Sequence, residues 1–506
     1  MQHDDLVGVN SDMTPLGTTS RGLSAKLQQV IGPKYINKGF YNVVILGVCF
    51  FFLFAAFGTT QSFITTIRKS EGFVSLSILY FVFAFSNFFA PSFCQVLTPK
   101  WALIIGALCY CFFVFAAGFE SSVLFYSASV VNGFGAALLW TAQGTLLTQS
   151  ANIAQVRIRE SQTDESKKSV EVMGFFSGIF FAIFQTNFIF GNILAGSLFG
   201  AGLSNFGVFM ILAIIATVGA VTMIALRSIK QSEIQRNVKD EGENQSSSLE
   251  VLEGGFLSRI LHNVKIYFTE NLLKQVKDFV SLLKQSFMVL FSLKMLVFSV
   301  ISFYSGYNTS YFTGSLPPII GKQMLGWVMI LFGIMQVVGA LISGKMADHI
   351  GRRVTMRVTM VIHCIALALS TQMVYWGNNL DRSNGATLFY LGFFIDMALF
   401  GLADSFLTNT IYAILGSKNY YKKKNTSEAF AAFKMTQALS SAIGFFCGIY
   451  LKIFHIQIIV GCAFFCYMIA FFVLDTFIAP VDSEKKATKG MPKKDSLLSS
   501  NNNLNN

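Results

Sequence analysis

Ionisable side chains inside long apolar runs are the residues of this sequence best placed to do chemistry. Asp404 lies in the apolar run 386–416 and Lys434 in the apolar run 428–451. A charge in the middle of a bilayer costs about 3 kcal/mol or more, so such a residue needs a partner or a function. We predict an ion pair or a water-linked pair between Asp404 and Lys434. Two roles stay open: a static pair that fixes helix packing, and a titrating pair that couples a proton or cation to conformational change.

Uncharged polar residues recur in several of the same apolar runs. Together with Asp404 they predict a polar central cavity for a solute, and Trp140 could stack on an organic solute there. The alternative is that the amides only form hydrogen bonds between helices. Asp396, without an obvious partner, is expected to be neutral and protonated, and His363 to be structural. The other predicted cavity residues are Thr59, Thr60, Gln61, Gln143, Gln185, Asn308, Asn409 and Gln437.

Enzyme signatures are missing from the sequence. It has no phosphate-binding glycine loop, no nucleophile elbow and no histidine–carboxylate metal cluster. We therefore expect no catalytic activity, no metal and no cofactor. The net charge of +12 comes from loop lysines and arginines, and it indicates membrane topology and attraction to anionic lipid rather than nucleic-acid binding.

The elements that must position these residues are transmembrane helices. Hydrophobic residues make up 53% of the chain and charged residues only 13%, a balance that no water-soluble fold could cover with polar groups. A helix needs about 20 apolar residues to cross a bilayer, and no run alternates as a β-barrel strand would. We predict an all-α membrane protein with twelve spans, near 41–66, 72–95, 100–119, 122–147, 171–200, 204–226, 287–311, 325–344, 356–376, 386–416, 428–451 and 455–478.

The distribution of lysine and arginine predicts the orientation. These residues are concentrated in the N-terminal tail and in the loops after the even-numbered spans, and they are sparse in the other loops. Because basic residues stay on the cytosolic side, both termini are expected to be cytosolic. The predicted partners are the lipid bilayer and either a small solute or another membrane protein. Plasma and endolysosomal membranes both remain open.

A long polar segment divides the predicted spans into two groups of six. Gly135–Leu146 in span four resembles Gly401–Tyr412 in span ten, which indicates an internal repeat. Within the central segment, apolar residues at helical spacing between Leu272 and Leu283 predict an amphipathic helix on the membrane surface. The expected units are a tail (1–39), a first half (40–226), a central loop (227–286), a second half (287–479) and a tail (480–506).

A charged decapeptide, GKMADHIGRR, lies between spans eight and nine. Gly344 and Gly351 permit a sharp turn, and Asp348 can accept hydrogen bonds from a helix N-terminus or from Arg352. Arg353 can anchor on lipid phosphate. These five residues predict a cytosolic gating loop. The corresponding loop of the first half, Ala90–Trp101, lacks this motif, so the two halves cannot be gated alike.

The decapeptide resembles the loop signature of the major facilitator superfamily. Phe54–Phe63, Ser75–Phe93, Leu139–Thr148 and Phe180–Asn192 further resemble signature runs of its Unc-ninety-three-like branch. The resemblance implies twelve helices in two six-helix halves. It also implies either a solute carrier or a non-transporting regulator, such as a channel-associated subunit or a trafficking chaperone for receptors. Relatives often carry an acidic residue where this chain has Asn308, which weakens ion coupling at that position.

The functional expectation is solute transport by alternating access at a midplane cavity. The alternative is a regulatory or chaperone subunit for an ion channel or receptor. Transport predicts a water-filled cavity lined by Gln143, Asn308, Asn409 and Asp404. Regulation predicts that phenylalanine and tryptophan fill this space and that small-residue stretches such as Gly191–Gly200 lie on an outer face.

Overall fold

The described part of the chain consists of helices joined by short turns. The computed structural model describes residues 38–160, 173–227, 229, 281, 284, 287–379, 382–415 and 426–478. The predicted amphipathic helix and both tails lie outside the described residues, apart from isolated positions. The helices are α2 (Lys38–Ile67), α3 (Ser70–Ser86), α4 (Ala90–Ala117), α5 (Ser122–Glu160), α6 (Met173–Gln185), α7 (Asn187–Gly200), α8 (Asn205–Thr222), α11 (Leu293–Ser310), α12 (Pro317–Ile320), α13 (Lys322–His349), α14 (Arg352–Asn379), α15 (Arg382–Leu415), α16 (Thr426–Tyr450) and α17 (Ile453–Val473). Short turns η2 (Met223–Ala225), η4 (Tyr311–Ser315) and η6 (Leu474–Ile478) extend α8, α11 and α17.

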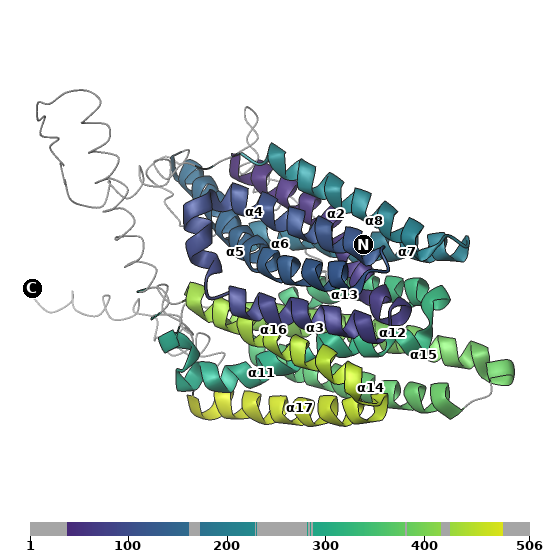
Figure 1. The fold of residues 1–506 in the computed structure, drawn as a ribbon. Coiled ribbons are helices and arrows are strands. Elements are labelled where there is room, and N and C mark those ends of the chain that lie inside the picture. The colour runs from purple at the N-terminus through teal and green to yellow at the C-terminus, as the bar shows by residue number, and fades with distance from the viewer. Residues whose placement is uncertain are drawn as a thin grey trace, which may run out of the picture.

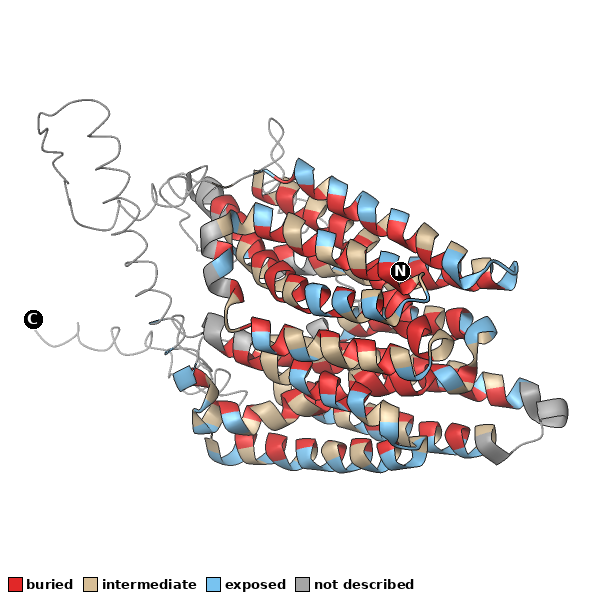
Figure 2. Cartoon of the chain, in the orientation of Figure 1, coloured by how far each residue is buried: buried red, intermediate tan, exposed pale blue. Residues whose placement is uncertain are grey.

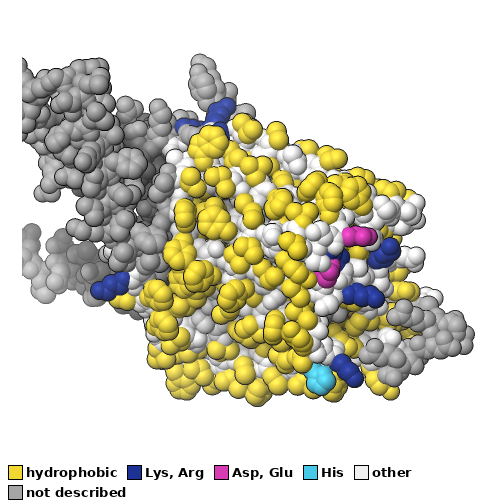
Figure 3. Space-filling model, viewed as in Figure 1, with side chains coloured by type: hydrophobic (Ala, Val, Ile, Leu, Met, Phe, Trp, Pro, Cys, Tyr) yellow, Lys and Arg dark blue, Asp and Glu magenta, His cyan; other side chains and the backbone are white. Residues whose placement is uncertain are grey.

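The helices have the length and composition of membrane spans. Within the described residues, nine segments are long and apolar enough to cross a bilayer, and α3 is a shorter apolar helix. Hydrophobic side chains cover the middle of the face in Figure 3, and the charged side chains visible there lie toward its two ends. This pattern is that of an integral membrane protein. The count of twelve spans in two halves stays a prediction.

The helices follow one another in two groups, with one exception. In Figure 1 the early helices, coloured purple to blue, occupy the upper part and the late helices, green to yellow, the lower part. We call α2 to α8 the N-terminal helices and α11 to α17 the C-terminal helices. The exception is α3, which lies along α16 (Figure 1). Helix α7 likewise packs against α13, so the two groups meet along two helix pairs.

The bundle has two ends, which we name by the arginines found there. At the Arg68 end, the Arg68 guanidinium donates to Glu71 of α3 and to the carbonyls of Phe119 and Glu120. At the Arg353 end, Arg353 forms an ion pair with Asp475 of η6, with an N–O distance of 2.6 Å. At this same end, the Lys100 ammonium links two of the N-terminal helices by donating to the carbonyls of Ile224 and Leu226.

Close helix crossings depend on glycine, because a side chain there would meet backbone. A Cβ atom at Gly326 of α13 would lie 2.7 Å from the Cα atom of Gly196 in α7. A Cβ atom at Gly401 of α15 would similarly overlap the carbonyl of Phe332 in α13. Figure 2 shows the consequence, with buried positions on the facing sides of the helices and exposed positions on their outer sides. Small residues at such crossings let helix backbones approach in a membrane.

Two of the predicted spans are interrupted. The predicted span 171–200 is broken at Thr186 into α6 and α7, and the Thr186 hydroxyl donates to the Ile183 carbonyl at 2.6 Å. The predicted span 287–311 ends in the π-helical turn η4 and continues into α12. π-Helical turns are rare and leave the regular α-helical hydrogen bonds unmade locally, so they often occur at functional sites.

Candidate functional site between the two groups of helices

Lys434 is a charged residue that lies between the N-terminal and C-terminal helices. Its ammonium lies 5.5 Å from the ring centre of Trp140 on α5, and 5.7 Å from that of Tyr412 on α15. The ammonium also donates a hydrogen bond to the Gln437 side chain at 2.9 Å, and Gln437 donates in turn to the Ser305 hydroxyl at 3.0 Å. Cation–π contacts and one amide acceptor therefore hold the charge inside the membrane region.

Aromatic rings fill the space behind Trp140. Its ring centre lies 5.5 Å from that of Phe50 and 5.3 Å from that of Phe54, both on α2, and 5.8 Å from that of Phe184 on α6. Edge-to-face packing of this kind fixes the indole, because each ring edge meets the face of another. One side of the Trp140 ring thus packs in the core of the N-terminal helices. The Lys434 ammonium, on a C-terminal helix, contacts the ring as well.

Asp404 is held by an amide rather than by Lys434. Its carboxylate accepts a hydrogen bond from the Gln336 side chain on α13 at 2.8 Å. Ion pairs within 4.0 Å are found for Arg68–Glu71 and Arg353–Asp475 among the described residues, and Asp404–Lys434 is not one of them. In this conformation the predicted charge pair is therefore not in direct contact. A water-linked pair between them stays a prediction.

Asn308 and Asn409 do not join Lys434. Asn308 is buried within the C-terminal helices, where its amide nitrogen lies 3.5 Å from His363 Nε2 on α14. Asn409 donates to the Ser343 hydroxyl of α13 at 2.9 Å. Asn308 therefore contacts the interior of one group of helices, whereas we expected it to line a central cavity. His363 also contacts the carbonyl of Thr359 on its own helix, which matches the expected structural role.

The remaining polar residues of the prediction lie on the N-terminal helices. Thr59 and Thr60 are buried on α2, and the described residues offer their hydroxyls no hydrogen-bond partner. Gln61 donates to Thr313 of η4 at 3.1 Å and accepts from the Tyr80 hydroxyl of α3 at 3.0 Å. Gln143 is buried on α5, and Gln185 is partly buried at the end of α6. Of this set, Gln61 is the residue whose side chain links the two groups of helices.

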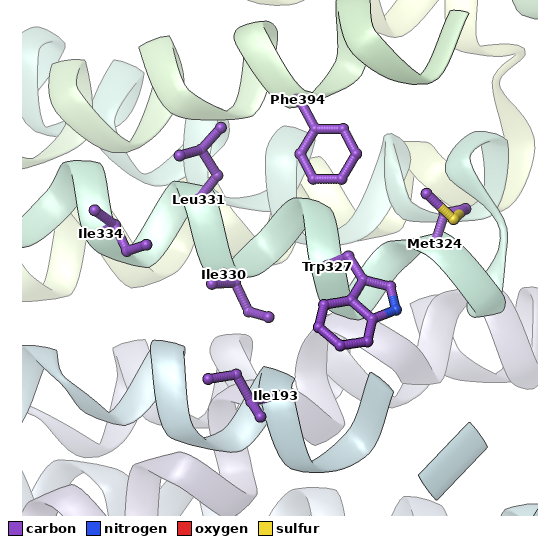
Figure 4. Close-up of a pocket in the computed structure, with 7 residues that line it drawn as sticks. All are labelled: Ile193, Met324, Trp327, Ile330, Leu331, Ile334 and Phe394. Atoms are coloured by element: carbon purple, nitrogen blue, oxygen red, sulfur yellow. The ribbon is translucent and has the colours of Figure 1, made fainter. Parts of the chain in front are cut away.

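An apolar groove opens between α7, α13 and α15. It has a volume of about 680 Å³, and Figure 4 shows Ile193 of α7 facing Ile330 and Trp327 of α13, with Phe394 of α15 above them. Met324, Leu331 and Ile334 complete the lining. Because its lining contains no charged groups, the groove suits a hydrocarbon chain. Its lining includes none of the residues that contact Lys434, so the groove is separate from the polar residues there.

The predicted gating loop is described in part. Gly351 forms the turn between α13 and α14 with a φ angle of 117°, a conformation that favours glycine. The Arg353 guanidinium forms an ion pair with Asp475, which is nearly buried, and its contact with lipid phosphate stays a prediction. Gly344 lies in α13 and Arg352 begins α14. The Asp348 side chain is not among those that the structure describes.

Several contact residues of the site were not predicted from the sequence. Asp404 accepts from Gln336, and the Tyr412 ring lies near the Lys434 ammonium. Ser305 accepts from Gln437, the residue that binds Lys434. Gln336 carried a usable signal, because it is an isolated amide inside the apolar stretch LFGIMQVVGALIS. Ser305 and Tyr412 carried none, since small hydroxyl residues and aromatics are common in membrane helices.

Comparison of the sequence with known families and proteins gives one consistent result. Residues 63–472 match the profile of the family described as ion channel regulatory protein UNC-93. The UNC93-like protein MFSD11 of Xenopus tropicalis is 28% identical over 469 residues, covering 85% of this chain and 95% of the relative. The unc-93 homolog A protein of Bos taurus is 28% identical, covering 80% of this chain and 86% of the relative. MFSD11 is also the member that the runs Gly401–Leu415 and Glu428–Gln437 resemble.

Solved structures with a similar arrangement of helices include transporters. The peptide transporter POT in complex with sulfate matches with a TM-score of 0.58 at 11% identity, covering 90% of this chain and 99% of the transporter. The nucleoside transporter NupG matches with a TM-score of 0.54 at 15% identity, covering 86% and 99%. At these identities the likeness establishes the fold alone.

Proposed function

The chain belongs to the family of the ion channel regulatory protein UNC-93, and we propose that it acts as a solute carrier of the major facilitator type. In this proposal twelve spans form two six-helix halves, 40–226 and 287–479, joined by a cytosolic loop, 227–286. Both termini are cytosolic. The two halves rock about a central site and expose it alternately to the two sides of the membrane.

The position of Lys434 is the observation that carries the proposal. Its ammonium reaches Trp140 of the N-terminal helices from a helix of the other group, and the neighbouring Tyr412 forms a ring contact with Phe181 of α6 at 5.9 Å. A charge in a membrane span is costly to maintain, so its presence between the groups favours a role there. The site suits a solute that brings an anionic group to Lys434 and an apolar or aromatic part to Trp140.

The closure of the bundle supports one conformation of an alternating-access cycle. Contacts between the two groups accumulate toward the Arg68 end, where Gln61 binds Thr313 and Gly196 packs on Gly326. On α3, the Ser77 hydroxyl donates to the Ala442 carbonyl of α16 at 3.0 Å. In the proposed cycle these contacts separate when the site opens toward the Arg68 end.

Transport is tested with the purified full-length protein in proteoliposomes and a metabolite panel that contains anionic, neutral and cationic solutes. We expect uptake or ligand-induced thermal stabilisation with at least one anionic solute. Lys434→Gln should remove it, and Lys434→Arg should retain part of it because the charge remains. Glu120→Gln, at the exposed Arg68 end, is the matched control and should leave uptake unchanged. Binding that is equal in Lys434→Gln would remove this site from the proposal.

The second candidate function is regulation of another membrane protein. It is favoured by the description of the family and by the aromatic rings that pack against Trp140. In contrast to the expectation for a regulator, Gly191 and Gly196 do not lie on an outer face, because both pack against neighbouring helices. A negative transport panel together with stoichiometric co-purification of a channel or receptor would favour regulation over transport.

A further inference from the structure

A buried carboxyl group inside the C-terminal helices is not used by the proposed solute site. Asp396 of α15 is fully buried, with 0% of its surface exposed. The Ser370 side chain of α14 lies beside it, but neither carboxyl oxygen has a hydrogen-bond partner of good geometry among the described residues. An unpaired carboxylate in an apolar interior is strongly disfavoured, so this group must bind something that neutralises it.

A chain of hydrogen bonds leads from the neighbourhood of Asp396 to two other elements. The hydroxyls of Ser370 and of Tyr311 in η4 lie 2.6 Å apart, and either atom could be the donor. The Gln457 amide of α17 donates to the Tyr311 hydroxyl at 3.0 Å and to the Ser370 carbonyl at 3.3 Å. The direction of the Ser370–Tyr311 bond is therefore free to reverse without any movement of heavy atoms.

Other ionisable groups on the packed elements are occupied elsewhere. On α15 itself, Asp404 lies eight residues away and accepts from Gln336 of α13. On α14, His363 lies seven residues before Ser370, about 10 Å along the helix, and contacts Asn308 of α11. On α16, Lys434 is bound at Gln437. On α11 and α17, Tyr304 and Tyr467 stack on each other, with ring centres 5.1 Å apart. No cation in the described residues is in ion-pair contact with Asp396.

A proton fits this place better than a metal ion does. The described residues contain no cluster of three metal-ligating His, Cys, Asp or Glu side chains, and the side chains of the chain beside Asp396 are the hydroxyls of Ser370 and Tyr311 and the Gln457 amide. A protonated carboxyl needs one acceptor, and the Ser370 hydroxyl can supply it. When the protonated Asp396 donates a hydrogen bond to the Ser370 hydroxyl, that hydroxyl donates in turn to Tyr311. When Asp396 is charged, both hydroxyls reverse and donate toward the carboxylate.

The same tyrosine connects this place to the contact between the two groups of helices. Tyr311 is the first residue of the π-helical turn η4, and Thr313 of that turn accepts from Gln61 of α2. Gln61 accepts in turn from Tyr80 of α3, whose ring stacks on Phe445 of α16 at 5.4 Å. The turn η4, which lacks regular α-helical bonding, therefore carries both Tyr311 of the hydroxyl chain beside the buried carboxyl and Thr313 of the contact at the closed Arg68 end.

We propose that Asp396, Ser370 and Tyr311 form a proton-binding site in the C-terminal helices, and that its occupancy controls closure of the Arg68 end through η4. The proton comes from the aqueous solution and converts the carboxylate to a carboxyl group. The neutral form keeps the closed arrangement seen here. The charged form recruits the hydroxyls of Ser370 and Tyr311, shifts η4 and weakens the Gln61–Thr313 contact. This site would work with or without a transported solute.

The protonated carboxyl can be observed directly in the full-length protein in lipid nanodiscs by infrared difference spectroscopy between acidic and alkaline pH. We expect a carbonyl band of a protonated carboxyl that disappears in Asp396→Asn. The band should shift in Ser370→Ala, which keeps the carboxyl but removes the hydroxyl beside it. Asp404→Asn and Glu120→Gln should leave that band in place. A band unchanged in both Asp396→Asn and Ser370→Ala would overturn the proposal.

Closure is measured by the distance between spin labels introduced at Leu203 and Tyr450, which lie at the Arg68 end in different groups of helices. In otherwise wild-type protein, alkaline pH should shift the population toward longer distances. Asp396→Asn should keep the short distance at both pH values, and Glu120→Gln should respond as the wild type does. Tyr311→Phe, which retains the carboxyl, should lose the pH response. A pH response that survives in Asp396→Asn would overturn the coupling, whatever the outcome of the solute panel.

Discussion

At the residue scale, the bond between Gln336 and Asp404 decides whether a carboxylate can stay inside the bundle. The Gln336 amide donates to the carboxylate at 2.8 Å. Replacing Gln336 by leucine removes this donor, and we expect a loss of about 1–3 kcal/mol in the free energy of unfolding because the carboxylate loses its partner. Thermal unfolding in nanodiscs measures the change.

The double variant tests whether this loss arises from the carboxylate. When Asp404 is replaced by asparagine as well, Gln336→Leu should cost less than it does alone, since no charge is left unpaired. A second amide bond between α15 and α13, from Asn409 to Ser343, offers a control, and Ser343→Ala should show no such dependence on Asp404. Equal losses in both backgrounds would contradict a charge-stabilising role for Gln336.

The same residues show how far sequence can predict a membrane site. Asp404, Lys434, Trp140 and Gln437 were recognised because each is polar or bulky in an apolar run. Their partners were not, because the run gives the depth of a residue along its helix but not the neighbour that faces it. The Lys434 ammonium therefore contacts Gln437 on its own helix and Trp140 across the bundle, whereas the need of a buried charge for a partner suggested Asp404.

At the element scale, the crossing of α11 and α16 depends on Gly306. A Cβ atom there would overlap the Gln437 carbonyl and the Ser440 hydroxyl. Gly306→Ala should therefore destabilise the protein by about 1–3 kcal/mol and displace Gln437, the acceptor of Lys434. Gly144 on α5 is the matched control, because a Cβ atom added there would meet nothing within 4 Å, and Gly144→Ala should be neutral or stabilise by up to about 1 kcal/mol. Equal effects of the two substitutions on thermal stability would contradict the tight crossing.

Element boundaries were predicted less well than the elements themselves. Long apolar runs predict that a helix exists but do not fix where it is interrupted: the break at Thr186 falls in the polar triplet Gln185–Asn187, and the π-helical turn Tyr311–Ser315 precedes two prolines. Such breaks depend on contacts between helices that are distant in sequence, as Gln61 with Thr313 illustrates. In the gating loop, the glycine at position 351 did point to a turn, since few other residues adopt its backbone conformation.

At the scale of the whole molecule, the distribution of basic residues predicts which end of the bundle faces the cytosol. We expect the Arg353 end to be cytosolic, because lysine and arginine are concentrated in the loops on that side. A glycosylation acceptor inserted between α14 and α15 should then be modified in cells, whereas the natural sequons at Asn244 and Asn425 should remain unmodified. Modification of Asn425 would reverse the predicted orientation.

A cross-link between the two groups of helices separates transport from regulation. Ser77 of α3 contacts the Ala442 carbonyl of α16, and the hydroxyls of Ser75 of α3 and Ser129 of α5 lie 2.7 Å apart within the N-terminal helices. Oxidation of the double variant Ser77→Cys and Ala442→Cys should reduce solute flux by about tenfold or more, equivalent to at least ~1.4 kcal/mol, and reducing agent should restore the flux. The cross-link stops α3 from leaving α16, which alternating access requires.

The matched cross-link, Ser75→Cys with Ser129→Cys, joins α3 to α5 without crossing between the groups of helices. It should therefore leave flux nearly unchanged if each half moves as a unit. Full flux through the protein with the α3–α16 cross-link formed would exclude rocking of the halves at this contact. Loss of flux with both cross-links would point to movement within the N-terminal helices instead, because α3 would then have to slide past α5 as well as leave α16.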